Sequence, residues 1–214
     1  MTPQFSRACD PVFLSVLGLE DRINRGAEPD PETERLRVVA ALDQAEAIIG
    51  FSEEWMLAKY ALVSWIDEVL LEAPWQGRDW WSNNVLEIEL FNSRLCNELF
   101  YVKAQEAGTL SSRDALEVFY VCVVLGFRGL YRDPSSAEIT ATQHGLPGNL
   151  DSWARQTATA IRLGQGLPSL KTGGEEGAGA PPLEGQGSMV WSVIMCAILG
   201  TVAVMYCFHT FVNL

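Results

Sequence analysis

One stretch near the carboxyl end, residues 189–208 (MVWSVIMCAILGTVAVMYCF), constrains the rest of the chain more than any other feature. It holds 20 residues without a charged side chain, and as a helix it would be about 30 Å long, which matches the hydrocarbon core of a bilayer. A helix buried in a protein core is the alternative, but core helices seldom stay apolar on every face over this length. We therefore expect residues 188–208 to form a transmembrane tail anchor, with residues 209–214 as a short tail beyond it.

The flanks of this stretch indicate its orientation and its packing. No Lys or Arg follows it, and the nearest one before it is Lys171. The positive-inside rule then places the amino-terminal part in the cytoplasm, and residues 1–13 lack the basic start and apolar core of a signal peptide. Within the stretch, small residues recur every four positions at Ser192, Cys196 and Gly200. Such a ridge favours close packing with a second transmembrane helix, either in a homodimer or in a membrane partner.

Residues 164–187 (GQGLPSLKTGGEEGAGAPPLEGQG) differ in composition from everything before them, because Gly, Pro and Glu dominate. Such a segment cannot bury enough apolar surface to order itself, so we expect a flexible linker. Its 24 residues would span about 25–30 Å as a Gly-rich coil. Residues 1–163 remain, which is enough for one domain with a core.

Charge and composition exclude several functions. The chain has 27 acidic and 15 basic residues, a net charge of -12, which argues against binding nucleic acid or lying flat on anionic lipid. Its five cysteines, without a CxxC pair, and its two histidines, His144 and His209, do not have the spacing of a zinc site or of a disulfide framework. We therefore expect no metal and no cofactor.

The pattern of residues 1–163 is helical almost throughout, and it predicts an all-α domain of about six to eight helices. The first helix is expected to begin at Asp10 and Pro11, a good cap and first-turn pair. Pro74–Asn84 reads as a connection whose tryptophans seal the end of the core. A kink is expected near Asn92, a weak helix former.

The third helix is expected to be the centre of the domain. Ser52 can cap its amino-terminal end, and residues 55–71 (WMLAKYALVSWIDEVLL) are apolar on nearly every face. A helix of this kind is surrounded by other helices.

No catalytic or nucleotide-binding motif occurs, and the carboxylates of Asp67, Glu68 and Glu72 are the candidate functional groups. Asp67 and Glu68 would point about 100° apart on a helix, whereas Glu68 and Glu72 share a face. They could form a solvated or ion-paired stripe with Arg128 and Arg132 as counter-charges, or line an acidic groove that docks a basic partner. A third hypothesis is a general acid–base pair in a tail-anchored enzyme, which requires a deep pocket and a raised carboxylate pKa.

Three segments in order, ALVSWIDEVLL followed by PW (61–75), LEIELFNSRLCNELFY (86–101) and LEVFYVCVVLGFRGLYR (116–132), together resemble the DotU/TssL (IcmH-like) family. Members are inner-membrane components of type VI secretion systems, with relatives in type IVB systems. The positions that match the family pattern are Asp67, Glu68, Leu86, Glu87, Phe91, Glu98, Phe100, Gly126, Phe127, Gly129, Tyr131 and Arg132. Tyr101 replaces a Phe of that pattern.

The resemblance implies a single-pass protein of the bacterial inner membrane. Its cytoplasmic domain would consist of two small helical bundles with a groove between them, and residues 209–214 would be periplasmic. The implied function is that of a non-enzymatic scaffold, which anchors the membrane complex and recruits the baseplate. The implied partners are an IcmF/TssM-like membrane protein and TssK-like baseplate proteins. Asp67 and Glu68 would face the groove, and the GFRGLYR stretch would be structural. The alternatives are the tail-anchored enzyme and the equivalent adaptor of a type IVB system.

Overall fold

The computed structural model describes residues 1–164. In that part of the chain every regular element is helical, which confirms the all-α prediction. The elements are α1 (Pro3–Asn24), α2 (Pro31–Ile49), α3 (Glu53–Glu72), α4 (Arg78–Asn83), α5 (Leu86–Phe91), α6 (Cys96–Ala107), α7 (Asp114–Val124), the 3-10 turn η1 (Gly129–Tyr131), α8 (Pro134–Gln143) and α9 (Leu150–Gly164).

The expected linker and anchor, including Ser192, Cys196 and Gly200, lie outside the described residues, except that Gly164 is the last residue of α9. Among residues 1–164, no helix combines the length and the apolar character needed to cross a membrane.

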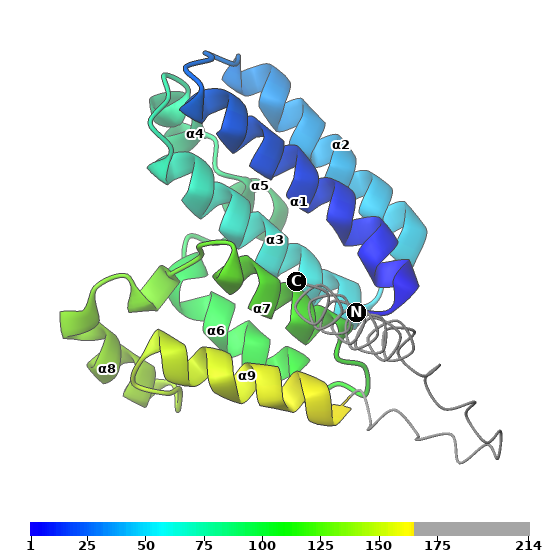
Figure 1. Cartoon of the computed structure of the whole chain (residues 1–214), viewed down its shortest axis with the longest axis vertical. Coiled ribbons are helices and arrows are strands. Elements are labelled where there is room, and N and C mark those ends of the chain that lie inside the picture. Colours follow the sequence, from blue (N-terminus) through cyan, green and yellow to red (C-terminus); the bar gives the residue numbers. More distant parts are fainter. Residues whose placement is uncertain (165–214) are drawn as a thin grey trace, which may run out of the picture. The chain divides into compact units, whose positions relative to one another are not determined.

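Helix α3 is the hub that the sequence predicts. The Ser52 hydroxyl caps it by accepting a hydrogen bond from the Trp55 backbone N–H at 3.1 Å. Both bundles pack against it (Figure 1). At its middle, Trp65 is fully buried, its ring centroid lies 5.2 Å from that of Phe13, and its indole N–H donates to the Leu125 carbonyl at 3.4 Å.

The remaining helices form two groups on α3. Helices α1, α2, α4 and α5 make up the first bundle, and α6, α7, η1, α8 and α9 make up the second (Figure 1). The expectation of two small bundles is thereby confirmed, with α3 shared between them.

The start of α1 corrects one prediction. The helix begins at Pro3, not at Pro11, and the Thr2 side chain caps it by accepting from the Phe5 backbone N–H at 3.4 Å. A proline inside a helix costs about 3 kcal/mol. The extra turns bury Phe5 and Cys9 in the core, and the burial of such side chains offsets that cost.

The tryptophan-rich connection after α3 is itself partly helical, because α4 forms within it. Trp75 and Trp81 are buried, as expected for side chains that close the end of a core. The Trp75 indole N–H donates to the Leu70 carbonyl at 2.8 Å. A side chain at Gly77 would overlap the Trp75 ring, so the turn requires glycine there.

The expected kink near Asn92 is a complete break between α5 and α6. Asn92 has a φ of 50°, in the left-handed region that asparagine tolerates better than most residues. The next helix, α6, begins at Cys96, and the chain passes there from the first bundle to the second.

Candidate partner-binding groove

Asp67 lies near the carboxyl end of α3 and fixes the start of α5. Its carboxylate accepts hydrogen bonds from the backbone N–H groups of Leu86 at 3.0 Å and Glu87 at 2.9 Å, and from the Trp81 indole N–H at 2.9 Å. Leu86 and Glu87 are the first residues of α5, so Asp67 satisfies amino-terminal donors that a helix leaves unpaired. The residue is only 2% exposed.

Glu68, the next residue, holds a loop of the second bundle. Its carboxylate accepts from the backbone N–H groups of Arg128 at 2.6 Å and Gly129 at 3.0 Å, and it pairs with the Arg132 guanidinium at 3.1 Å. Gly129 has a φ of 50°, and a Cβ there would lie 2.8 Å from the Phe127 ring. The loop can approach Glu68 closely only because this residue is glycine.

The sequence predicted that Arg128 and Arg132 are both counter-charges of the α3 carboxylates, and only one of them is. Arg132 is one, because its guanidinium pairs with Glu68 and with Glu72. The Arg128 guanidinium instead donates to the carbonyls of Val123 at 3.3 Å and Phe127 at 3.2 Å. The Arg128 side chain thus binds a carbonyl near the end of α7, and Arg128 contributes to Glu68 only through its backbone N–H.

Glu72 lies one turn after Glu68 on the same face of α3, as the spacing predicts, and both bind Arg132. Its side chain is 50% exposed, whereas that of Glu68 is 4% exposed. Of the three predicted site residues, Glu72 is therefore the one that a partner can reach directly.

A fourth carboxylate, Glu87, was not selected as a site residue from the sequence. It is 3% exposed and accepts from the Tyr60 hydroxyl at 2.9 Å and from the Leu95 backbone N–H at 3.1 Å. It thereby fixes the segment between α5 and α6. Its match to the family pattern was the available signal, but its donors Tyr60 and Leu95 lie 27 and 8 positions away in sequence.

The side chains of Asp67, Glu68, Glu87 and Arg132 line a cavity of about 380 Å³, which we call the groove. Its residues come from α3, from α4 to α6 and from the loop after η1, so it lies where the two bundles meet on α3. The groove residues are Asp67, Glu68, Leu71, Ser82, Val85, Glu87, Arg94, Cys96, Asn97 and Arg132. Its carboxylates are buried, while Arg94 is exposed and Arg132 is half-exposed.

Burial perturbs the acids of the groove. It raises the pKa of Asp67 to about 6, against the opposing effect of the hydrogen bonds from Leu86, Glu87 and Trp81. Burial also raises the pKa of Glu68, although the Arg128 N–H and the Arg132 charge act in the opposite direction. Both oxygens of each carboxylate already accept hydrogen bonds. The raised pKa values therefore come from burial of structural acids.

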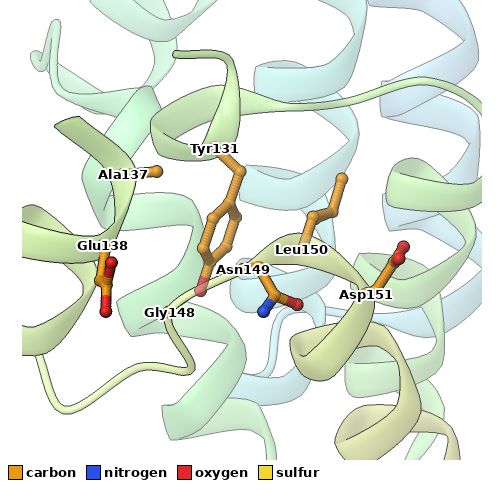
Figure 2. Close-up of a pocket in the computed structure, with 7 residues that line it drawn as sticks. All are labelled: Tyr131, Ala137, Glu138, Gly148, Asn149, Leu150 and Asp151. Atoms are coloured by element: carbon orange, nitrogen blue, oxygen red, sulfur yellow. The ribbon is translucent and has the colours of Figure 1, made fainter. Parts of the chain in front are cut away.

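A second cavity, of about 490 Å³, lies between η1, α8 and the start of α9. Figure 2 shows the carboxylates of Glu138 and Asp151 on either side of Tyr131, whose hydroxyl donates to the Pro147 carbonyl at 2.5 Å. This bond ties the end of the GFRGLYR stretch to the segment before α9, as expected of a structural motif. No feature of the sequence pointed to the cavity. Within residues 1–164, no group of three or more His, Cys, Asp or Glu residues is placed to hold a metal ion.

The family model described as "Type VI secretion system protein DotU" matches residues 4–212. The chain belongs to this family. Among solved structures, the cytoplasmic domain of TssL from Acinetobacter baumannii is similar, with a TM-score of 0.54 and 24% identity over 72% of this chain and 96% of that one. TssL (SciP) from enteroaggregative Escherichia coli 042 has a TM-score of 0.49 and 20% identity, over 68% of this chain and 90% of that one. No curated protein matches. The DotU family match confirms the resemblance read from the sequence, and the Acinetobacter structure shows the same helical fold.

Proposed function

We propose that this DotU-family chain is a non-enzymatic adaptor of a type VI secretion system in the bacterial inner membrane. Residues 1–163 form its cytoplasmic domain, residues 164–187 a flexible linker, residues 188–208 a transmembrane anchor and residues 209–214 a periplasmic tail. The charge-free run, the Gly- and Pro-rich segment before it and the absence of basic residues after it support this arrangement.

The groove is the surface that we assign to partner docking, and one observation carries this proposal. The three segments that match the family pattern, distant in sequence, meet around one cavity between the bundles. The proposed partners are TssK-like baseplate proteins and the IcmF/TssM-like membrane protein. By joining the two, the chain would anchor the membrane complex and recruit the baseplate.

The groove residues then divide into two roles. Asp67 and Glu68 shape the walls, because their carboxylates are buried and already bonded. Arg132 lines the groove, and Glu72 lies next to the lining because it pairs with Arg132. Both side chains are half-exposed, so a partner can form hydrogen bonds and ion pairs with this pair, which we call the rim. In the membrane, the ridge of Ser192, Cys196 and Gly200 would pack against a second copy or the membrane partner. The net charge of -12 disfavours nucleic acid as a partner.

The tail-anchored enzyme remains a second candidate, because a cavity and a raised carboxylate pKa occur together at Asp67. Acid–base catalysis needs a carboxylate that can reach the proton of a substrate. At Asp67 and Glu68 the bonds to backbone N–H groups would first have to break. The enzyme hypothesis predicts that Asp67→Asn abolishes function while partner binding persists, and the adaptor hypothesis predicts that binding and function fall together.

A pull-down of baseplate proteins with the detergent-solubilised full chain tests the docking surface. Glu72→Lys reverses a reachable charge at the groove, and Asp43→Lys reverses an exposed charge on α2 as a matched control. We expect Glu72→Lys to lose the baseplate proteins and Asp43→Lys to retain them, with circular dichroism confirming that both are folded. Equal retention by both variants would show that the rim of the groove is not the contact surface. Gene neighbourhood distinguishes a type VI from a type IVB adaptor, and the description of the matching family favours type VI.

A further inference from the structure

Segments far apart in the sequence meet at the end of the domain where α9 stops. The Gly164 backbone packs against the Arg113 side chain at the start of α7. The next residue, Asp114, accepts a hydrogen bond from the Thr2 backbone N–H at 2.7 Å, and Gln4 of α1 donates to the Ile48 carbonyl near the end of α2 at 3.0 Å. Figure 1 shows the amino terminus and the ends of α2 and α9 on the same side of the domain. We call this side the exit end, defined by residues 1–4, 48–54, 110–114 and 161–164.

Large apolar side chains are exposed at the exit end. Phe51, in the turn between α2 and α3, is 81% exposed, Leu163 is 77% exposed and Ile48 is 40% exposed. An isolated exposed apolar residue is normal on a soluble surface. The position of these three is the informative feature, because all of them belong to the exit end, where α9 and the described part of the chain stop.

The sequence after Gly164 indicates which apolar environment the exposed side chains of the exit end can contact. Residues 165–188 number 24 and lead to the charge-free run that begins at Met189. A Gly-rich coil of that length spans about 25–30 Å on average. If the run crosses the bilayer, as the proposed function requires, the exit end lies on average at about that distance from the membrane surface. A lipid surface is then the apolar environment that these side chains meet at a high effective concentration.

We infer that the exit end rests on the cytoplasmic surface of the bilayer, with Phe51 and Leu163 inserted among the lipids. This inference rests on the proposed function, because it needs the anchor. Aromatic and leucine side chains are the ones that enter the headgroup boundary in interfacial segments. The contact can be weak in itself, since the tether makes it intramolecular.

The charges at the exit end indicate that apolar contact, not lipid charge, drives the association. The exposed or half-exposed charged side chains there are Glu53, Glu54, Arg113 and Arg162, two acidic and two basic. Their opposite signs leave no strong attraction to anionic headgroups. The association is therefore expected to persist at high salt and in lipids without net charge.

Photo-crosslinking of the full chain in lipid nanodiscs tests this inference. The crosslinking residue p-benzoylphenylalanine replaces Phe51 or Leu163 in two samples, and Leu36 or Leu14 in two controls. Leu36 and Leu14 are 71% and 68% exposed, so they match the test positions in exposure. Leu36 lies in α2 at about 20 Å from its end at Ile49, by the rise of a helix.

The expected result is a several-fold higher yield of lipid adducts at positions 51 and 163 than at positions 36 and 14. The yield should be the same in zwitterionic phosphatidylcholine and in a mixture with phosphatidylglycerol. Equal yields at all four positions would overturn the inference. Crosslinks from position 51 to another protein chain in place of lipid would also overturn it. Extraction with alkaline carbonate, done in parallel, reports on the anchor itself. A chain that is released by carbonate refutes the proposed anchor, whereas a retained chain without lipid adducts refutes only the inference.

Discussion

Along α3, the residues from Trp55 to Ile66 are held mainly by apolar packing, whereas the carboxylates of Asp67, Glu68 and Glu72 in its last part are held by hydrogen bonds and ion pairs. In the first stretch, fully buried side chains such as Trp55, Trp65 and Ile66 contact the surrounding helices. In the last part, Asp67 and Glu68 are also buried, yet they bind backbone N–H groups, at the start of α5 and at the start of η1 respectively.

The difference shows that burial serves two purposes in one helix. Apolar burial joins the bundles to α3 without specifying which loop lies where. The buried carboxylates select particular backbone groups, because an unpaired acid in the interior is strongly unfavourable. The groove therefore takes its shape from the polar stretch and its stability from the apolar one.

Replacing Trp65 with Ala should have the largest effect in this comparison. Loss of a fully buried indole that contacts Phe13 is expected to lower the free energy of unfolding by about 3–5 kcal/mol. Urea denaturation followed by circular dichroism measures it, with the partly buried Trp80→Ala as a control. A loss below about 1 kcal/mol would contradict the assignment of α3 as the hub.

Asp67→Ala should have the next largest effect, because it leaves the Trp81 indole N–H and the backbone N–H groups of Leu86 and Glu87 without their acceptor. We expect a loss of about 2 kcal/mol at pH 7. The amide protons of Leu86 and Glu87 should also exchange faster with solvent than in the native protein, and those in the middle of α3 should not. Unchanged exchange at α5 would show that Asp67 does not fix this helix.

The same substitution carries a pH signature. The pKa of Asp67 is raised to about 6 in the folded protein from an ordinary value of 3.8, so the folded state takes up the proton first as the pH falls. The stability that this group contributes is fully present below about pH 4 and is lost as the pH rises through about 6. The difference between native protein and Asp67→Ala should therefore grow by roughly 2–3 kcal/mol from pH 7 to pH 4. The opposite trend would mean that the hydrogen bonds outweigh burial.

The smallest effect is expected at Glu72. Its ion pair with Arg132 is half-exposed on both sides, and exposed ion pairs contribute at most about 1 kcal/mol. Glu72→Gln should change the free energy of unfolding by about 0.5 kcal/mol or less, and 0.5 M salt should reduce the difference further. A loss of unfolding free energy as large as that of Asp67→Ala would show that Glu72 is a structural acid like Asp67 and Glu68, and that the distinction between the groove walls and the rim is wrong.

Local signals in the sequence were sufficient for much of the fold. The Ser52 cap and the apolar length of α3 depend on residues within a few positions, and both are confirmed. The irregularity at Asn92 was also placed correctly, but it was predicted as a kink and is a break between two helices. The start of α1 was wrong because Pro3 and Pro11 both suit a first helical turn. Only the burial of Phe5 by the rest of the fold decides between them.

The site was predictable in part. The resemblance to the family selected Asp67 and Glu68, and the helical repeat placed Glu68 and Glu72 on one face, as found. Arg132 was predicted as a counter-charge and is found paired with Glu68 and Glu72, but the backbone and indole donors to Asp67 and Glu68 could not be predicted. The donors to Asp67 lie 14 to 20 positions away, and those to Glu68 lie 60 or 61 positions away. Spacing along one helix carries no information about such partners.

Asp67 and Glu68 are adjacent in α3, about 1.5 Å apart along the helix axis. The start of α5 in the first bundle and the loop before η1 in the second are therefore bonded to the same turn of α3. The two walls of the groove cannot shift independently of that turn. Arg132 of the second bundle pairs with Glu68, and the start of α5 in the first bundle is bonded to the adjacent Asp67. A displacement of this turn along the helix axis would therefore have to move both sets of bonded backbone groups together.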